Sequence, residues 1–448
     1  MRYHAAAMTP FRTRILAAAA ALACAAMSHA APPRPNVLFI LSDDQRFDTI
    51  HALGNSEIQT PNLDKLVERG FVFKNAYCQG GMVAAICSPS RSMLMTGLSI
   101  FHTPEWDDRK FTGPTLGGEF TRAGYATLYA GKKSNSFLTG NEAFAKCIYT
   151  DDKLIETEKP DENSIAAQQP KLMADAAIEF LQADHGDKPT FVFLAPHYPH
   201  DPRVAPKKFN DLYDPAKISL PPNFMPQHPF DNGDMNVRDE QLAKLPRDPD
   251  EMKRHIADYY ASISWLDDQV GRVLDDLKQR GQLENTIVIY TSDQGLAVGG
   301  RHGLMGKQNL YEEFKSPLII AGPGVPHDSS DALVYLFDLF PTLCGMAKID
   351  IPPICEGINL QYVMKGEGAG TRDVLFGAYK DVQRMVRDER WKMISYPKIN
   401  RYQLFDLKND PWEIHDLSAD PAQQDQLAAM KKKLVREQLY WQDPLHRW

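Results

Sequence analysis

Residues 36–44 read Asn-Val-Leu-Phe-Ile-Leu-Ser-Asp-Asp, a continuous apolar run that ends in two adjacent aspartates. Such a run is typical of a strand buried on both faces, as in a parallel sheet covered by helices. Open α/β sheets bind their ligands at the carboxyl ends of the strands, which is where Asp43 and Asp44 would lie. Two adjacent carboxylates repel each other unless a cation lies between them. The stretch therefore predicts a parallel sheet with a cation site, and the alternative is a solvated loop that caps a helix.

Three further apolar runs, at residues 124–130, 190–195 and 286–291, have the same character. Each is followed by polar or ionisable side chains: Lys132 after the first, His197 and His200 after the second, Asp293 and Gln294 after the third. Residues 255–277 have apolar side chains at helical spacing. The sequence predicts an α/β fold in which a large, mostly parallel sheet is flanked by helices on both faces.

Residues 87–91 read Cys-Ser-Pro-Ser-Arg, and a helix is expected over residues 92–98. A lone Cys-x-Pro-x-Arg motif is a weak signal. The alternative is a buried cysteine ahead of a helix that Ser88 caps and Pro89 opens. Arg91 would lie close to Cys87 in the first turn, where backbone N–H groups add positive potential that suits an anion.

Together with the strand ends, residues 87–91 resemble the signature of the type I sulfatases, the formylglycine-dependent sulfatases of the alkaline phosphatase-like superfamily. The resemblance covers nearly the whole chain after residue 35. It implies that Cys87 is oxidised after translation to Cα-formylglycine, also called 3-oxoalanine. The hydrated aldehyde is a gem-diol, in which one hydroxyl attacks sulfur and the other expels sulfate afterwards.

The resemblance also implies roles for individual side chains. The ligands of one divalent cation, Ca²⁺, would be Asp43, Asp44, Cys87, Asp293 and Gln294. The catalytic residues would be Cys87, Arg91, Lys132, His200 and Lys307, and the substrate-binding residues His302, His197 and Ser134. His200 best fits the sulfate-contacting histidine of the family, with His197 as second choice, and His200 is also the expected acid for the leaving group. Ser134 stands where the family usually has a histidine, which is a departure from the family pattern.

The C-terminal part has a different pattern. From about residue 370, short predicted strands are separated by turns and followed by a helix over residues 421–439. This resembles the small antiparallel C-terminal α+β subdomain of the family, and it carries no obvious chemistry. We therefore expect a signal peptide at residues 1–30, a catalytic domain at 31–369 and a small subdomain at 370–448. Residues 204–250, rich in proline, are expected to form an irregular surface segment.

The first thirty residues match a secretory signal peptide. They combine three arginines, an apolar run at residues 15–27 that is short for a membrane span, and small residues at 28–30. We expect export to the periplasm or the extracellular space. A terminal anchor helix is the alternative, and Cys24 hints at lipoprotein processing.

Charge and cysteine content narrow the function further. Without the three arginines of the signal, the formal charge falls from −8 to −11. This negative charge, with no run rich in lysine or arginine, argues against a nucleic-acid surface. The five cysteines after residue 30 are too few for a disulfide framework, and they allow one or two bridges or buried thiols alone.

The prediction is an exported sulfatase that hydrolyses a sulfate monoester, either of a sulfated glycan or of a small aryl or alkyl compound. Its maturation would require a formylglycine-generating enzyme as partner, and no transmembrane span is expected. One alternative is a phosphonate monoesterase or phosphodiesterase of the same superfamily. Another is a non-catalytic binder of sulfated ligands, which only Ser134 supports.

Overall fold

The structure is a computed structural model, and it describes residues 34–104, 111–133, 143–150, 161–367 and 372–446. The chain divides into two units, Met1–Arg34 and Pro35–Trp448. Everything below concerns the second unit. The predicted signal peptide at residues 1–30 lies outside the described residues, as does Ser134.

The main sheet has nine strands, and five adjoining strands in the order β7-β1-β6-β4-β5 are parallel. The strands across the sheet are β10 (Asp328–Tyr335), β2 (Phe71–Tyr77), β9 (Leu318–Ala321), β7 (Thr286–Ser292), β1 (Asn36–Ser42), β6 (Thr190–Ala195), β4 (Ala126–Lys132) and β5 (Lys146–Thr150), with β8 (Lys315–Ser316) paired to β2. Only β9 and β8 run antiparallel to their neighbours. The expected mostly parallel sheet is confirmed.

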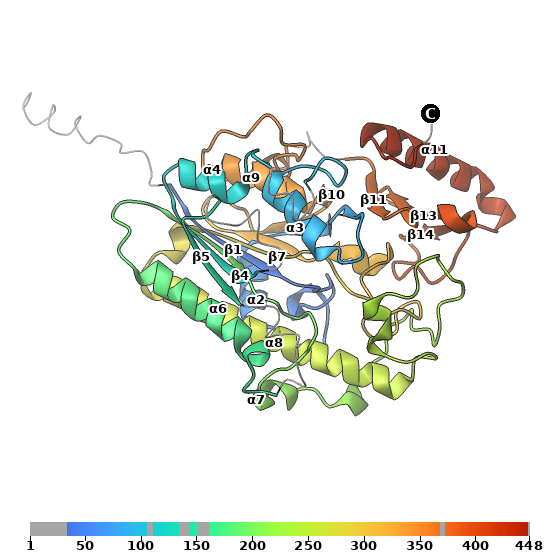
Figure 1. Cartoon of the computed structure of the whole chain (residues 1–448), viewed down its shortest axis with the longest axis horizontal. Coiled ribbons are helices and arrows are strands. Elements are labelled where there is room, and N and C mark those ends of the chain that lie inside the picture. Colours follow the sequence, from blue (N-terminus) through green and yellow to red (C-terminus); the bar gives the residue numbers. More distant parts are fainter. Residues whose placement is uncertain (1–33, 105–110, 134–142, 151–160, 368–371, 447–448) are drawn as a thin grey trace, which may run out of the picture. The chain divides into compact units, whose positions relative to one another are not determined.

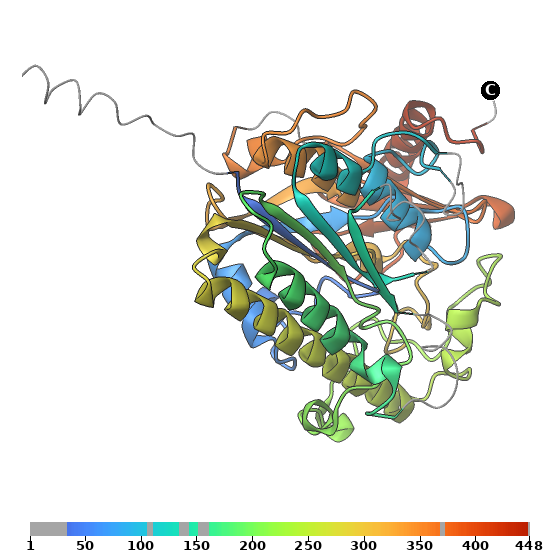
Figure 2. The same cartoon turned by 60° about the vertical axis from the view of Figure 1, so that its left-hand side comes forward.

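Each face of this sheet is covered by its own layer of helices, because alternate residues of the buried strands point to opposite faces. Val37 and Phe39 of β1 belong to one apolar core, whereas Leu38 and Ile40 belong to the other. Figures 1 and 2 show both layers. One layer holds α2 (Pro61–Arg69), α6 (Ile165–Gln182) and α8 (Pro249–Gln279), and the other holds α3 (Cys87–Thr96), α4 (Leu116–Arg122) and α9 (Leu339–Met346).

A second sheet of five strands is formed mainly by the C-terminal part of the chain. Its order is β14 (Arg401–Asp406), β13 (Trp391–Tyr396), β12 (Gln383–Arg387), β11 (Leu375–Tyr379) and β3 (Gly80–Gly81), and α11 (Gln424–Tyr440) packs on it. The four C-terminal strands are antiparallel, as expected. The predicted boundary near residue 370 stays a prediction.

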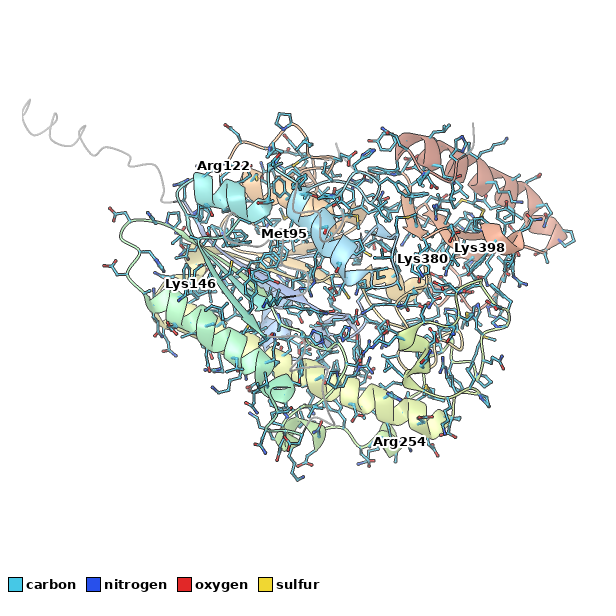
Figure 3. The ribbon with its side chains drawn as sticks, in the orientation of Figure 1. Met95, Arg122, Lys146, Arg254, Lys380 and Lys398 are labelled. Carbon is cyan, nitrogen blue, oxygen red and sulfur yellow. The ribbon has the colours of Figure 1, made fainter. Side chains whose placement is uncertain are left out.

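The fifth strand of this sheet, β3, comes from the segment just before Cys87. It pairs with β11 in parallel, with Gly80 opposite Ala378. Lys380, labelled beside the C-terminal strands in Figure 3, donates its backbone N–H to Gly81 O at 2.9 Å. The C-terminal sheet therefore holds one end of the loop that leads to Cys87.

Shorter elements complete the fold. They are α7 (Lys207–Asn210), α10 (Gln361–Met364) and the 3-10 helices His51–Leu53, Pro215–Lys217, Arg238–Leu242, Leu283–Asn285, Glu312–Phe314, Leu336–Asp338, Pro397–Ile399 and Pro421–Gln423. Residues 204–248 are otherwise irregular, so the irregular segment predicted at 204–250 ends two residues earlier, where α8 begins. Within the described residues, none of the helices combines the length and apolar character that a membrane crossing requires.

The sequence did not indicate β10, although that strand pairs with β2 at the edge of the main sheet. Its sequence, Asp-Ser-Ser-Asp-Ala-Leu-Val-Tyr, begins with four polar residues, and this half of the strand is mostly exposed. An edge strand needs no continuous apolar run, because only part of it is buried. β5 at the opposite edge was missed for the same reason, since it too is only partly buried.

We predict that Gly80→Ala destabilises the protein more than Gly54→Ala. Both glycines have a positive φ, +111° and +109°, so each substitution carries backbone strain. A Cβ at Gly80 would lie 1.8 Å from Ala378 O, whereas a Cβ at Gly54 meets nothing within 4 Å. Urea unfolding should show a loss about 1–3 kcal/mol larger for Gly80→Ala. Equal losses would contradict the tight pairing of β3 with β11.

Candidate active site

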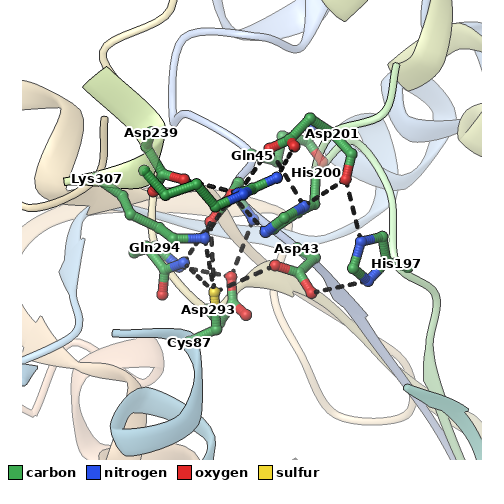
Figure 4. A network of polar contacts seen from close by, with 12 residues as sticks. Asp43, Gln45, Cys87, His197, His200, Asp201, Asp239, Asp293, Gln294 and Lys307 are labelled. Carbon is green, nitrogen blue, oxygen red and sulfur yellow. Dashed lines mark hydrogen bonds and ion pairs between the residues drawn. The ribbon is translucent and has the colours of Figure 1, made fainter. Parts of the chain in front are cut away.

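The carboxyl ends of four adjacent strands meet at one edge of the main sheet, in the order β7, β1, β6, β4. They carry the predicted residues: Asp293 and Gln294 after β7, Asp43 and Asp44 after β1, His197 and His200 after β6, and Lys132 at the end of β4. Figure 4 shows most of these side chains around Cys87. Neighbouring parallel strands end at the same edge, which is why residues distant in sequence are close in space.

Cys87 is the first residue of α3, and Ile86 is the residue that caps this helix. The helix therefore begins two residues earlier than the alternative with Ser88 as cap and Pro89 as first residue. Ser90, one turn along, donates its hydroxyl to Asp293 O at 2.6 Å and so ties α3 to the end of β7.

The side chain of Cys87 is buried and surrounded by charged and polar groups. Its Sγ lies 3.1 Å from Lys307 Nζ, 3.0 Å from Gln294 Nε2 and 3.4 Å from Asp43 Oδ1. Burial, and after it the charge of Asp43, raises the pKa of the Cys87 thiol well above its usual value. A thiol with a raised pKa is mostly protonated near neutral pH and is a poor nucleophile.

Three buried cations pair with three buried carboxylates in this site. Arg91 Nη2 lies 3.0 Å from Asp43 Oδ2, Arg91 Nε 2.9 Å from Asp293 Oδ2, Lys132 Nζ 3.1 Å from Asp43 Oδ2, and Lys307 Nζ 2.9 Å from Asp44 Oδ2. Buried charges are tolerated when they are paired and hydrogen-bonded in this way. The formal charges of the six side chains sum to zero.

The three carboxyl groups nevertheless differ in their affinity for protons. Burial tends to raise the pKa of Asp43, but the charge of Lys132 helps to outweigh it and holds this pKa well below its usual value. Burial raises the pKa of Asp44 to about 7, because Lys307 offsets it only in part. Burial and the charge of Asp43 also raise the pKa of Asp293. The carboxylates therefore repel one another, and an added cation would relieve this repulsion.

The donor set fits a cation. Potential ligand atoms from four side chains lie within 4.8 Å of one another, namely those of Asp43, Asp44, Cys87 and His200. Gln294 directs its Nε2 to Asp44 Oδ1 and to Cys87 Sγ, and its Oε1 is buried without a hydrogen-bond partner among the described residues, so the amide oxygen would become a ligand only if the amide group turned over. Asp293 Oδ1 accepts from the backbone N–H groups of Asp44 and Gln294, both at 3.0 Å, which holds this loop around the site.

Two histidines border the same carboxylates. His200 Nε2 lies 3.6 Å from Asp44 Oδ2, and its Nδ1–H donates to Asp201 O at 2.7 Å. His197 Nδ1 lies 4.0 Å from Asp43 Oδ2, and the two imidazole rings are 4.4 Å apart. Burial and nearby lysines lower the pKa of His197 to about 3 and that of His200 well below its usual value. Both imidazoles are therefore neutral in this state.

His302, by contrast, belongs to a different group of side chains. Its Nε2 lies 2.9 Å from Glu312 Oε2 and 3.0 Å from Asn223 Nδ2, and its ring stacks on Tyr311 with the centroids 3.9 Å apart. All its described side-chain partners lie outside the Cys87 cluster. The structure therefore gives His302 a supporting place in the loop after β7, and the predicted contact with substrate stays a prediction.

Sequence reasoning missed Gln308, which joins three segments next to Lys307. Its Oε1 accepts from the backbone N–H of Lys307 at 3.0 Å. Its Nε2 donates to Ala84 O, in the loop before Cys87, at 3.1 Å, and to Asp239 Oδ2 at 2.9 Å. A single glutamine has no distinguishing signal in a sequence, because its role depends on segments that meet only in the fold.

Gln383 on β12 was missed for the same reason. Its Nε2 donates to Gln308 O at 3.0 Å, and its Oε1 accepts from the N–H of Leu310 at 3.2 Å. Gln383 is fully buried. The C-terminal sheet, for which the sequence indicated no chemistry, therefore supports the segment that carries Lys307.

We predict that Gln383→Leu lowers both stability and turnover. The substitution leaves a backbone N–H and a backbone C=O of the Lys307 segment without partners, at a cost of about 1–3 kcal/mol each. Urea unfolding and steady-state kinetics on an aryl sulfate would measure the two effects. The matched control is Gln403→Leu, since Gln403 is also buried in this sheet but its side chain accepts, among the described residues, from the hydroxyls of Tyr311 and Tyr396.

The control should lose stability and keep kcat within about twofold of the wild type, since it leaves the backbone of the Lys307 segment in place. An unchanged kcat in Gln383→Leu would mean that the C-terminal sheet does not position Lys307. Equal losses of kcat in both variants would mean the same.

The fold and this cluster together define an α/β protein with a buried group of paired charges at the carboxyl edge of its main sheet. Residues 35–349 match the family described as Sulfatase, and residues 300–439 match the description N-sulphoglucosamine sulphohydrolase, C-terminal. The chain belongs to the sulfatase family, and it is a sulfuric ester hydrolase.

Individual relatives are similar over most of their length. An arylsulfatase of Clostridium perfringens is 26% identical, with 90% of this chain and 94% of the relative covered. An N-acetylglucosamine-6-O-sulfatase of Bacteroides thetaiotaomicron is also 26% identical, with 90% and 86% covered.

Two solved structures share the fold. A protein in complex with its substrate D-glucosamine-2-N,6-O-disulfate superposes with a TM-score of 0.76 at 22% identity, covering 92% of this chain and 99% of that protein. The phosphonate monoester hydrolase of Agrobacterium radiobacter gives a TM-score of 0.75 at 22% identity, with 91% and 96% covered. The second similarity is to an enzyme named for a different activity, so fold alone does not decide the substrate.

Proposed function

We propose that this chain is an exported sulfatase that hydrolyses a sulfate monoester with one Ca²⁺ and with Cys87 oxidised to 3-oxoalanine. The observation that supports this most is the position of Cys87, whose Sγ contacts Lys307 and Asp43 at the centre of three paired cations and carboxylates. Export rests on the predicted signal at residues 1–30, and maturation would require a formylglycine-generating enzyme.

Calcium is the cation that the oxygen donors favour. We propose Asp43, Asp44, Asp293 and Gln294 as ligands, together with position 87. Hard cations such as Ca²⁺ bind carboxylate and amide oxygens, whereas a thiol is a poor ligand for them. When bound, the ion would neutralise charge on the ester, so that an anionic substrate enters a site of net positive charge.

Oxidation of Cys87 would resolve two difficulties, because an unmodified thiol is a poor ligand for Ca²⁺ and, at its raised pKa, a poor nucleophile. The raised pKa of the thiol argues against catalysis by a thiolate. A hydrated aldehyde at this position would instead provide oxygen both as a ligand and as a nucleophile. Lys307 Nζ, 3.1 Å from the Sγ, is placed to stabilise negative charge on that oxygen.

The remaining side chains bind the anion and serve the leaving group. Arg91, Lys132 and Lys307 would bind and orient the sulfate group through charge-assisted hydrogen bonds. His200 is the proposed acid for the leaving oxygen. Its Nδ1–H bond to Asp201 O leaves Nε2 directed to the site, where it can carry a proton once an anionic substrate raises its pKa. The role of Ser134, in place of the usual histidine, stays a prediction.

We propose a sulfated saccharide as the substrate class, with small aryl sulfates as accessible model substrates. This rests on the glucosamine disulfate complex and the N-acetylglucosamine-6-O-sulfatase named above, both of which act on or bind sulfated amino sugars. The second candidate activity is phosphonate monoester hydrolysis, which the similar fold of the Agrobacterium radiobacter enzyme favours.

We predict that the wild-type protein hydrolyses 4-nitrophenyl sulfate and that Cys87→Ala abolishes this activity while the protein stays folded. Exhaustive chelation should lower the wild-type rate, and Ca²⁺ should restore it. Initial rates on 4-nitrophenyl sulfate and on a 4-nitrophenyl phosphonate monoester, measured under the same conditions, separate the two candidate activities.

Cys78→Ala is the matched control, because Cys78 is an equally buried cysteine outside the 87–91 motif. It should retain sulfate ester hydrolysis. Activity retained in Cys87→Ala would refute the assignment of Cys87. Full activity of the metal-free protein would refute the cation site, and a higher kcat/KM on the phosphonate would favour the second candidate.

A further inference from the structure

A cavity of about 780 Å³ lies outside the Cys87 cluster and shares no lining residue with it. It is bordered by the 3-10 helix His51–Leu53, by α2, β2, β8 and β9, and by the first residues of β10. Its volume falls within the range of about 300–1,000 Å³ that is usual for small-molecule sites. None of the activities discussed above uses it.

The walls of this cavity are mainly apolar. They include Phe47, Leu53, Val67, Val72, Phe73 and Leu318. These side chains come from five different segments of the chain, so the cavity is part of the fold and is not formed by one loop. An apolar ring or chain of a ligand would therefore find a preformed surface, and its burial there would favour binding.

Lys315 supplies a cation to the cavity. Its Nζ lies 3.8 Å from the centre of the Phe47 ring, and none of the ion pairs among the described residues includes Lys315. Lys74, the other lysine of the lining, is by contrast exposed and lies 3.4 Å from Asp331 Oδ2. Lys315 is therefore a partly buried ammonium whose described side-chain contact is an aromatic face.

The surroundings of Lys315 leave its charge only partly compensated. Burial, as the largest cause, lowers the pKa of Lys315, and the charge of Arg387 acts in the same direction. Tyr77, Asp48 and Glu413 act in the opposite direction, but among the described residues the ion pairs of Asp48 and Glu413 are with other cations. A cation–π contact stabilises such a charge by less than the cost of removing an ammonium from water.

A hydroxyl next to Lys315 also lacks a partner. Ser316 lines the cavity, and its Oγ is buried without a hydrogen bond to any described residue. Buried polar atoms are nearly always hydrogen-bonded in native proteins, so an unpaired one calls for an explanation. Successive side chains of β8 point to opposite faces of the sheet, so this hydroxyl is not assigned to a ligand of Lys315.

We propose that this cavity binds a small organic anion with an apolar body, whose anionic group pairs with Lys315. The shared ligand chemistry is a carboxylate or sulfonate-type group on an aromatic or aliphatic body. This inference is independent of the proposed sulfatase chemistry, because no residue of the Cys87 cluster takes part.

Binding of 2-naphthoate and 2-naphthalenesulfonate to the purified full-length protein, measured by calorimetry, tests the proposal. Uncharged 2-naphthalenemethanol is the control ligand. We expect Lys315→Met, which keeps the apolar stem, to weaken binding of the anions by about tenfold, the effect of roughly 1.4 kcal/mol. The alcohol should bind both proteins within about twofold of the same affinity, because it makes no use of the charge.

Matched variants test whether the anions bind in this cavity. Lys74→Met removes a lining lysine that has a carboxylate partner, and it should leave the affinity for the anions within about twofold. Lys307→Met removes a cation of the Cys87 cluster, and it should also leave the affinity of the cavity for the anions unchanged. Leu53→Trp fills the cavity and should abolish binding of both the anions and the alcohol. Circular dichroism and thermal unfolding confirm that each variant is folded.

Three outcomes would overturn the proposal. They are an affinity that Lys315→Met does not change, a loss of affinity in Lys307→Met instead, and the absence of anion binding by the folded wild-type protein. If only one of the two probes binds through Lys315, the proposal holds and the class of anion is narrowed to carboxylates or to sulfonates.

Discussion

Three carboxylates are buried within reach of one another at the ends of β1 and β7, and the rest of the site depends on their compensation. Asp43, Asp44 and Asp293 could not remain ionised together without nearby positive charge. The chain supplies this charge as Arg91 from α3 and as two lysines from other segments. Because the six charges cancel, an added divalent cation leaves a net charge of +2, and an anion then becomes the favoured ligand.

This balance requires segments that are far apart in sequence to be held close together. The parallel sheet fixes the strand ends, and Ser90 ties α3 to β7. The C-terminal sheet provides the remaining support through Gln383, which holds Gln308, and through β11, which pairs with Gly80. The C-terminal sheet, which carries none of the predicted catalytic residues, therefore contributes to the site by positioning Lys307 and the loop before Cys87.

Much of the fold could be predicted because its central strands have continuous apolar sequences. The prediction of a strand at residues 190–195 coincides with β6, and that of a helix at 255–277 lies within α8. The predicted ligands and cations could be placed near one another because parallel strands share one carboxyl edge. Edge strands such as β10, and the two-residue β3, lack this signal because they are short or partly exposed.

Side chains that act through hydrogen bonds between distant segments could not be predicted. Gln308 and Gln383 have no residue pattern that separates them from other glutamines, and their role appears only when three segments meet. The position of His302 could not be predicted from the sequence either, since a histidine five residues before Lys307 could have faced either side of its loop. In the fold it pairs with Glu312.

The most direct test of this account is the binding of inorganic sulfate to the protein with and without Ca²⁺, measured by calorimetry after the metal content has been determined. In the metal-free protein the three cations are neutralised by the three carboxylates, so sulfate should bind weakly. With Ca²⁺ bound, the account predicts an affinity for sulfate at least about tenfold higher, the effect of 1.4 kcal/mol or more. Equal affinity in the two states would contradict it.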